Sequence, residues 1–176
     1  MHMRLISWNI QGRVSTLDGQ LVALAERRPD LVALQEVRVS TIAPLIAGLN
    51  AIGLPYTAES VSLALDQERR FGLLIASRWP LQPLPILDVP RQERVLPVLI
   101  DSPTGALELH NAHVPQGAGN GWVKVETFEG IYNRLARLAP HHRILCGDFN
   151  SPQQEHSDGY LVTWGQDVLP NGNAAI

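Results

Sequence analysis

The first third of the chain alternates apolar runs with polar breaks in a regular order. Residues 4–10 alternate as a strand does and stop at a Gln-Gly pair. Residues 31–36 are nearly all apolar until the last two, which is typical of a central strand covered on both faces. Residues 17–28 and 41–49 have the spacing of helices. This part of the chain therefore predicts the order strand, helix, strand, helix.

The middle of the chain changes to short apolar or alternating runs with polar or proline-rich breaks between them. Such a rhythm is typical of a strand meander. The predicted strands are residues 56–65, 72–77, 84–89, 95–101 and 106–113.

A glycine-rich loop at residues 117–121 then leads into the longest predicted helix. This helix covers residues 122–138, with apolar side chains along one face and a proline just after it. A last apolar strand follows at residues 143–147. Beyond Ser151 the pattern weakens, and only a short helix or strand near residues 160–164 is expected.

This order of elements predicts an α/β fold, best accommodated by a layered α/β sandwich. With 176 residues and 45% hydrophobic side chains, the chain is long enough for one domain with a real core. No linker or repeat divides it, and no apolar segment approaches membrane-spanning length. The single cysteine, Cys146, lies in an apolar strand, so we expect a buried thiol and a cytoplasmic protein.

The charge of the chain excludes a generally basic nucleic-acid binder. Its net charge is −3, and its fourteen cations are thirteen arginines and Lys124. The bias toward arginine is consistent with phosphate-binding forks. A base-composition bias in the coding sequence explains it at least as simply, and we favour that explanation.

Polar side chains follow several of the apolar runs where the predicted strands end. Five of them are of the kinds that phosphate-processing sites use: Asn9, Glu36, His113, Asp148 and Asn150. Each also has a purely structural interpretation. The asparagines and Asp148 suit polar turns, Glu36 can pair with a surface arginine, and a lone histidine at a strand end is more often structural. Their joint appearance favours a site.

In combination these segments resemble the endonuclease/exonuclease/phosphatase superfamily of DNase I-like hydrolases. The resemblance covers residues 4 to about 152. It implies a four-layered sandwich (α-β-β-α) and metal-dependent hydrolysis of a phosphate ester of nucleic acid, lipid or inositol phosphate. The matching motifs are Ser7-Trp8-Asn9-Ile10, Leu34-Gln35-Glu36, Gly72-Leu73-Leu74-Ile75-Ala76-Ser77-Arg78, Asn111-Ala112-His113-Val114-Pro115 and Gly147-Asp148-Phe149-Asn150.

The resemblance also implies a role for each strand-end residue. Glu36 would hold Mg²⁺, with Mn²⁺ as a substitute, and Asn9 would lie beside it on the metal or the phosphate. Asp148 would orient or deprotonate the attacking water, and Asn150 would bind a phosphate oxygen. His113 would steady the phosphate or help to protonate the leaving oxygen. A hard cation on oxygen ligands suits this chemistry, because charge builds up on an already anionic phosphate.

Two further residues are candidates for substrate contact. Gln116 lies in the run Val114-Pro115-Gln116-Gly117, which resembles the exonuclease III-type branch of the superfamily, although His113 resembles the DNase I and sphingomyelinase branches. Arg94 is placed to meet substrate phosphate at the rim of the site. The alternative for Arg94 is an ordinary solvent-facing side chain.

One expected motif is missing from the sequence. The superfamily pattern ends in an Asp-His pair that acts on the phosphate, and no Asp-His dipeptide occurs in this chain. We therefore expect residues 1–176 to be one domain that lacks its C-terminal part, with an incomplete second sheet and impaired turnover. The alternative is a catalytically silent fragment or binding module that needs a missing C-terminal half. An uncovered sheet edge also predicts self-association or marginal stability.

Overall fold

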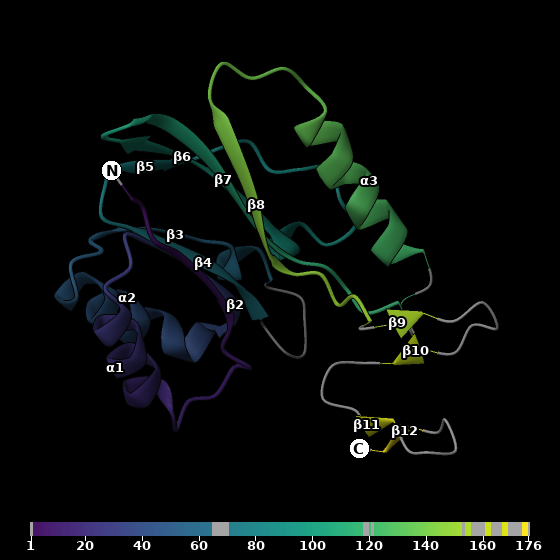
Figure 1. The fold of residues 1–176 in the computed structure, drawn as a ribbon, viewed down its shortest axis with the longest axis horizontal. Helices are drawn as coiled ribbons and strands as arrows, with labels where there is room; N and C mark the ends of the chain where they lie inside the picture. The colour runs from purple at the N-terminus through teal and green to yellow at the C-terminus, as the bar shows by residue number, and fades with distance from the viewer. Residues whose placement is uncertain are drawn as a thin grey trace.

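Two four-stranded sheets lie face to face in the computed structural model, which describes residues 2–64, 71–117, 120, 122–152 and the backbone of four short strands beyond (Figure 1). The first sheet has the order β1-β2-β4-β3, and the second has the order β5-β6-β7-β8. Strands β1 and β2 are parallel, as are β7 and β8, and the other pairs within these sheets are antiparallel.

The strands of the first sheet are β1 (Leu5–Asn9), β2 (Leu31–Arg38), β3 (Tyr56–Glu59) and β4 (Phe71–Ser77). Those of the second sheet are β5 (Leu81–Pro83), β6 (Val95–Ser102), β7 (Gly105–His113) and β8 (His142–Asp148). The helices are α1 (Leu17–Arg27), α2 (Ile42–Ala51) and α3 (Val123–Leu135). Three 3₁₀ turns cover Val39–Thr41, Val61–Leu63 and Gln92–Arg94. The short strands are β9 (Gln154–Glu155), β10 (Leu161–Val162), β11 (Asp167–Val168) and β12 (Ala174–Ala175).

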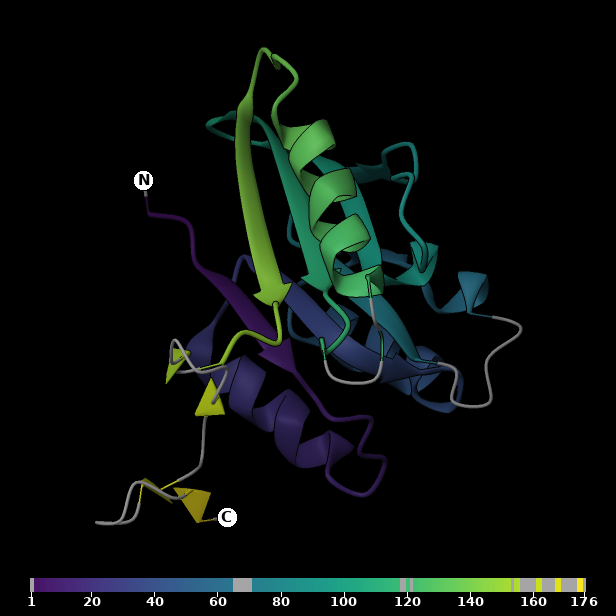
Figure 2. The ribbon, with the colours of Figure 1, turned by 90° about the vertical axis from the view of Figure 1, so that its right-hand side faces the viewer.

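Three apolar clusters hold the layers together. The first joins α1 and α2 to the outer face of the first sheet, with Leu24 and Leu49 buried against Leu74. The second fills the space between the two sheets, and the third packs Ile131 of α3 against the second sheet. Figure 2 shows α3 lying along β7 and β8. The predicted α-β-β-α sandwich is confirmed.

Prolines account for the clearest error in the predicted strands. Residues 84–89 form no strand, and the chain pairs instead over β5, just before them. Pro83, Pro85 and Pro90 each lack a backbone N–H, so this segment cannot sustain a ladder. It contributes Leu87 and Val89 to the cluster beneath α3 instead.

Other boundaries differ by a few residues. The strand predicted for 56–65 ends at Glu59 and continues as a 3₁₀ turn, while residue 65 lies outside the described ranges. Helix α3 ends at Leu135, three residues earlier than predicted. Of residues 160–164, β10 accounts for two and the others lie outside the description, as do residues 118, 119 and 121 of the glycine-rich loop.

Strands β1 and β8 form one edge of each large sheet. Along β7 every residue from Leu107 onward is buried, whereas every residue of β8 is at least partly exposed. Within the described ranges, β1 pairs only with β2 and β8 pairs only with β7. No helix in the described part of the chain is long and apolar enough to cross a membrane.

Candidate active site

The parallel strand pairs deliver the predicted residues to one end of the sandwich. In the first sheet, Asn9 at the end of β1 is in register with Gln35 of β2. In the second sheet, His113 at the end of β7 is in register with Asp148 at the end of β8. Because strand ends of layered α/β folds collect functional groups, this end of the sandwich is the natural place for a site.

Glu36 enters the site through an irregularity in β2. The register between β2 and β4 shifts between Leu34 and Val37, and Glu36 has a φ of +57°. A bulge of this kind re-aims one side chain without ending the strand. The neighbours Gln35 and Val37 stay buried, while the side chain of Glu36 remains 27% exposed. A left-handed backbone at a glutamate is strained, and such strain is concentrated at functional positions.

Asn9 links the two carboxylates of the site. Its Nδ2 donates to Oε1 of Glu36 at 3.1 Å and to Oδ2 of Asp148 at 2.8 Å. Its Oδ1 accepts the backbone N–H of Gln11 at 2.9 Å, so the turn-satisfying role of Asn9 is real as well. In this arrangement the amide nitrogen of Asn9 binds both carboxylates, and its amide oxygen binds the backbone of Gln11. Its role as a metal ligand stays a prediction.

The turn after β8 is held from several directions. Gly147 has a φ of +140°, and a Cβ there would overlap the carbonyl oxygen of Ala112, so only glycine allows β8 to approach β7 this closely. The backbone N–H of Asn150 donates to Oδ1 of Asp148 at 2.9 Å, and its Nδ2 donates to the carbonyl oxygen of Val114 at 2.7 Å. Nζ of Lys124 donates to the carbonyl oxygen of Asn150 at 2.8 Å.

Two buried amides fasten the sheets to each other beneath the site. Nε2 of Gln35 donates to Oδ1 of Asn111 at 2.7 Å, and Nδ2 of Asn111 donates to the carbonyl oxygen of Leu34 at 2.9 Å. Both side chains are fully buried, where a satisfied polar pair fixes one relative placement of the strands. Gln35 and Asn111 therefore set the spacing between Glu36 and His113.

Arg94 determines the protonation of His113. Nη1 of Arg94 lies 2.5 Å from Nδ1 of His113. A guanidinium has only donors, so Nδ1 must be the acceptor and the ring proton must be on Nε2. That nitrogen lies 3.7 Å from Oε1 of Glu36. His113 is therefore a neutral ring that presents an N–H to the site.

The surroundings of this pair favour the neutral ring. Burial, and then the charge of Arg94, lower the pKa of His113, and the opposing effects of Glu36 and Asp148 are smaller. Burial also lowers the pKa of Arg94, partly offset by Glu93, whose Oε1 lies 3.5 Å from Nε of Arg94.

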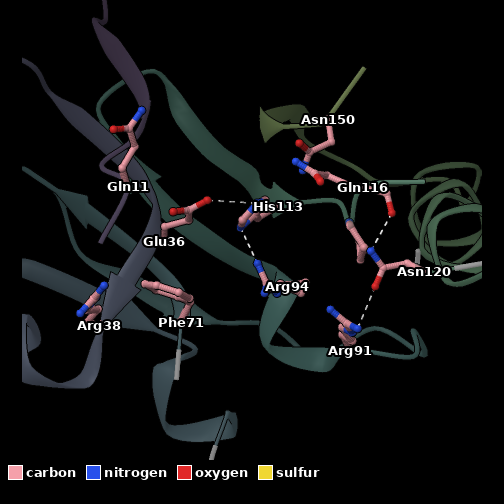
Figure 3. A pocket seen from close by; sticks show the side chains of 11 residues that line it. Gln11, Glu36, Arg38, Phe71, Arg91, Arg94, His113, Gln116, Asn120 and Asn150 are labelled. Carbon is pink, nitrogen blue, oxygen red and sulfur yellow. Dashed lines mark hydrogen bonds and ion pairs between the residues drawn. The ribbon is translucent and has the colours of Figure 1, made fainter. Parts of the chain in front are cut away.

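These residues surround a cavity of about 840 Å³ (Figure 3). Five of the seven predicted residues line it, while Asn9 and Asp148 stand behind Glu36 and Asn150 and hold them in place. All seven therefore belong to one constellation. The full lining is Gln11, Glu36, Arg38, Phe71, Arg91, Arg94, His113, Pro115, Gln116, Asn120 and Asn150.

The donor set fits a hard divalent cation. Two carboxylates share one amide group, and neither forms an ion pair with an arginine or lysine within the described residues. No three His, Cys, Asp or Glu side chains of the described chain are arranged as a metal cluster. A cation would thus be held by Glu36 and Asp148 with water in the remaining positions, which is the coordination that Mg²⁺ prefers.

Sequence reasoning missed part of the cavity wall. Gln11, Arg38, Phe71, Arg91 and Asn120 line the cavity, and none of them was predicted as a site residue. The excess of arginine over lysine was the available signal for phosphate-binding arginines. Explaining it by base composition left these residues out of the predicted site. Glu36, in contrast, does not form the surface ion pair that was its structural alternative with any described arginine; it contacts Asn9 and His113.

Comparisons with known proteins agree with this geometry. The sequence profile described as "Endonuclease/Exonuclease/phosphatase family" matches residues 6–166. No curated protein sequence matches the chain.

Several solved structures are similar in fold. An endonuclease/exonuclease/phosphatase from Beutenbergia cavernae has 21% identity and a TM-score of 0.67, covering 89% of this chain and 49% of that one. An AP endonuclease from Archaeoglobus fulgidus has 24% identity and a TM-score of 0.68, covering 89% and 62%. A Neisseria 3′ phosphatase, NExo, bound to a product DNA hairpin has 20% identity and a TM-score of 0.62, covering 87% and 60%. The chain thus spans about half to three fifths of the length of these proteins, and the likeness establishes the fold.

Proposed function

Because the chain belongs to the endonuclease/exonuclease/phosphatase family, we propose that its site hydrolyses phosphate esters with a divalent cation, Mg²⁺ or Mn²⁺. One observation supports this most strongly. Asn9 draws Glu36 and Asp148 together from two different sheets, beside the N–H of His113 and at the edge of a large cavity. Two carboxylates that form no ion pair with an arginine or lysine of the described residues are the ligands that a hard cation requires.

In the proposed reaction, water attacks phosphorus, the bond from phosphorus to the leaving oxygen breaks, and the leaving oxygen takes its proton from solvent. A cation, which Glu36 and Asp148 would hold, would supply positive charge against the charge that builds up on the phosphate. Asp148 orients the water and takes its proton, since its carboxylate is already held by hydrogen bonds from Asn9 and Asn150.

The remaining residues bind the phosphate. His113 donates its Nε2–H to a phosphate oxygen, because Arg94 fixes the neutral ring in that tautomer. A neutral imidazole gives up its last proton reluctantly, so steadying the phosphate suits His113 better than protonating the leaving oxygen. One N–H of the Asn150 amide is taken by Val114, which leaves the other for the phosphate. Arg94 and Gln116 line the same cavity.

Nucleic acid is our first choice of substrate. An AP endonuclease and a 3′ phosphatase bound to a DNA hairpin are among the similar folds. The chain as a whole carries a net charge of −3, but the cavity lining contains three arginines against one glutamate. A local positive field of this kind attracts a phosphate chain even when the protein is acidic overall.

Hydrolysis of bis-p-nitrophenyl phosphate and of abasic duplex DNA with Mg²⁺ tests this proposal. We expect slow turnover, since the sequence contains no Asp-His pair. Glu36→Ala and Asp148→Ala should each lower it at least about 100-fold, because the cation loses half of its protein ligands. Glu129→Gln, which changes an exposed carboxylate on α3, should leave turnover unchanged. Equal rates in wild type and both alanine variants would rule out metal-assisted hydrolysis at this site.

A further inference from the structure

Two arginines of the cavity have no task in the proposed reaction. Arg38 follows Glu36 at the end of β2, and Arg91 directly precedes the 3₁₀ turn that carries Arg94. Both line the cavity with the reacting residues. In Figure 3 they appear on opposite sides of Arg94, Arg38 beside Phe71 and Arg91 beside Asn120.

No carboxylate of the described residues fixes Arg38. Its guanidinium carbon lies 5.2 Å from the centre of the Phe71 ring, in a cation–π contact. A Cβ at Gly12 would overlap the Phe71 ring and press on Nε of Arg38, so the backbone at Gly12 closes the other side of this unit. An aromatic face positions the guanidinium but does not neutralise it, and its N–H edges stay available.

Arg91 is fixed by a chain of amides. Its Nη2 donates to Oδ1 of Asn120 at 3.0 Å, and Nδ2 of Asn120 donates to the carbonyl oxygen of Gln116 at 2.8 Å. The loop after β7 thereby holds Arg91 in place through neutral groups. Most donors of this guanidinium, and all of its charge, are left for a ligand.

The charges of the lining do not balance. Arg94 has Glu93 beside it, but in the described ranges neither Arg38 nor Arg91 forms an ion pair with a carboxylate. An oriented guanidinium in a cavity can donate two parallel hydrogen bonds to phosphate oxygens. At about 840 Å³ the cavity is at the upper end of the range for ligand sites, so a ligand there extends well beyond one phosphate group.

We propose that Arg38 and Arg91 form subsites for non-reacting phosphates, so that the site takes phosphate esters carrying a second phosphate group on the same molecule. This rests on the proposed function only in that the cleaved phosphate lies at Glu36 and His113. The shared chemistry is a second phosphate at a short distance from the first. A nucleic-acid strand and a multiply phosphorylated inositol both supply it, whereas a choline phosphodiester does not.

Binding without turnover tests the proposal independently of catalysis. Isothermal titration in EDTA at low salt would compare thymidine 5′-monophosphate with the dinucleotide pTpT and with inositol 1,4-bisphosphate. Wild type should bind at least one of the two-phosphate ligands about tenfold or more tightly than the monophosphate, because each charge-assisted contact contributes at least about that factor. The ligand that gains more identifies the source of the second phosphate.

Three substitutions, each of which removes one positive charge, complete the experiment. Arg38→Gln and Arg91→Gln should each reduce the preference for two phosphates, measured as the ratio of the two affinities within the same variant. Arg137→Gln, on an exposed residue outside this cavity, should keep the preference. Wild type without a preference, a preference kept in both cavity variants, or an equal loss in Arg137→Gln would overturn the proposal. Failure of hydrolysis with this binding pattern intact would count against the proposed reaction alone.

Discussion

A single donor at Nδ1 limits what His113 can do. As long as Arg94 donates there, the ring cannot be doubly protonated and cannot accept a proton at Nε2. Sequence reasoning gave Arg94 a direct contact with substrate, and the structure adds this second contact. Arg94 thus acts on the site partly through the tautomer of its neighbour.

The tautomer can be measured without any substrate. Long-range ¹H–¹⁵N spectra at pH 8 should show Nδ1 of His113 unprotonated and Nε2 protonated. In Arg94→Met, which keeps the aliphatic stem but removes every donor, the two ring nitrogens should shift toward each other as both tautomers become populated. Exposed His142 serves as an internal reference. A proton on Nδ1 in the wild-type spectrum would contradict the assignment.

Cys146 is less buried than the sequence led us to expect. The residue is partly exposed, but burial still raises the pKa of its thiol to about 11, against a smaller opposing effect of Ser7. At pH 8 the thiolate is therefore scarce. We expect Ellman's reagent to react slowly with the folded protein and at least about tenfold faster in guanidinium chloride. Equal rates in the two conditions would show that the thiol is not protected.

Strand-end chemistry was readable from the sequence because a charged side chain at the end of an apolar run is conspicuous. Glu36 and Asp148 could be named on that basis. The left-handed backbone of Glu36 could not be predicted, because glutamate has no preference for that conformation. Arg38 and Arg91 were equally hidden, because their place depends on an aromatic ring and an amide that approach only in the folded chain.

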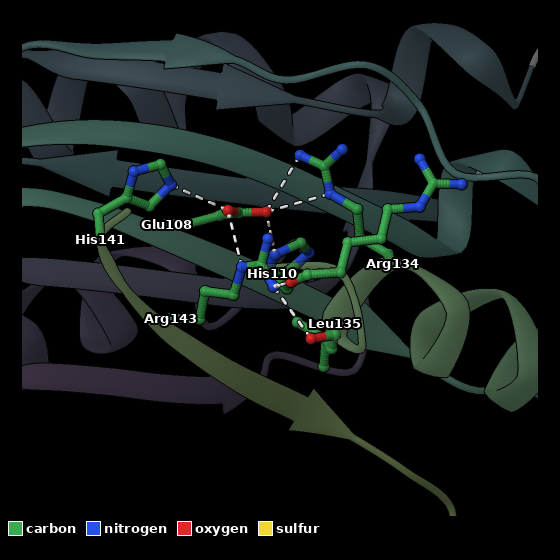
Figure 4. A network of polar contacts seen from close by, with 7 residues as sticks. Glu108, His110, Arg134, Leu135, His141 and Arg143 are labelled. Carbon is green, nitrogen blue, oxygen red and sulfur yellow. Dashed lines mark hydrogen bonds and ion pairs between the residues drawn. The ribbon is translucent and has the colours of Figure 1, made fainter. Parts of the chain in front are cut away.

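At the scale of elements, β8 and α3 are fastened by one buried carboxylate on β7. Oε1 of Glu108 accepts from His110 and Arg134, and Oε2 accepts from His141 and Arg143, at 2.8–3.1 Å (Figure 4). The side chain of Glu108 is only 2% exposed. Nη1 of Arg143 also donates to the carbonyl oxygen of Leu135 at the end of α3. The network thus joins three elements that follow one another along the chain, β7, α3 and β8.

Replacing Glu108 by Gln should destabilise the fold by about 3 kcal/mol, because buried cations lose their counter-charge. Urea unfolding measures the change, with Glu129→Gln as the exposed control. A change below about 0.5 kcal/mol would mean that the network is not a structural fastening.

The same carboxylate predicts a dependence on pH. Burial alone would raise the pKa of Glu108, but hydrogen bonds from Arg143 and His141 and the charge of His110 outweigh burial and lower the pKa from 4.5 to about 2. A lowered folded-state pKa stabilises the protein above the unfolded value, and this contribution disappears as the pH falls toward 2. The difference between wild type and Glu108→Gln should therefore shrink between pH 4.5 and 2. A constant difference across that range would contradict it.

Element boundaries show where pattern reasoning ends. Strand β2 was predicted well, because an apolar run buried on both faces leaves little choice. The segment after β5 was misread, because Leu84, Ile86 and Leu87 look like strand residues while the prolines between and around them remove the ladder donors. Leu87 and Val89 are buried there and Ile86 is exposed, so the prolines set the conformation and only part of the apolar run joins the core.

For the whole molecule, the layered sandwich and the family are confirmed, while the metal and the substrate stay proposals. The order of elements fixed which layers must exist. It could not show that three arginines of an acidic chain would line one cavity.

Within the described residues, β1 and β8 each leave one edge unpaired, which leads to an expectation about assembly. Unpaired edges with partly buried apolar side chains favour pairing with another chain. We expect sedimentation velocity to show concentration-dependent self-association in the micromolar range. A single monomeric species at all concentrations would contradict this expectation and indicate that the edges are adequately protected.

Binding of Mn²⁺, followed by the loss of its free electron paramagnetic resonance signal, tests the central claim most directly, because it needs neither turnover nor a known substrate. Wild type and Glu129→Gln should bind the ion with equal affinity at a site that Mg²⁺ competes for. Glu36→Gln and Asp148→Asn should each weaken binding at least about tenfold. Unchanged binding in both of these variants would show that the two carboxylates do not hold the cation.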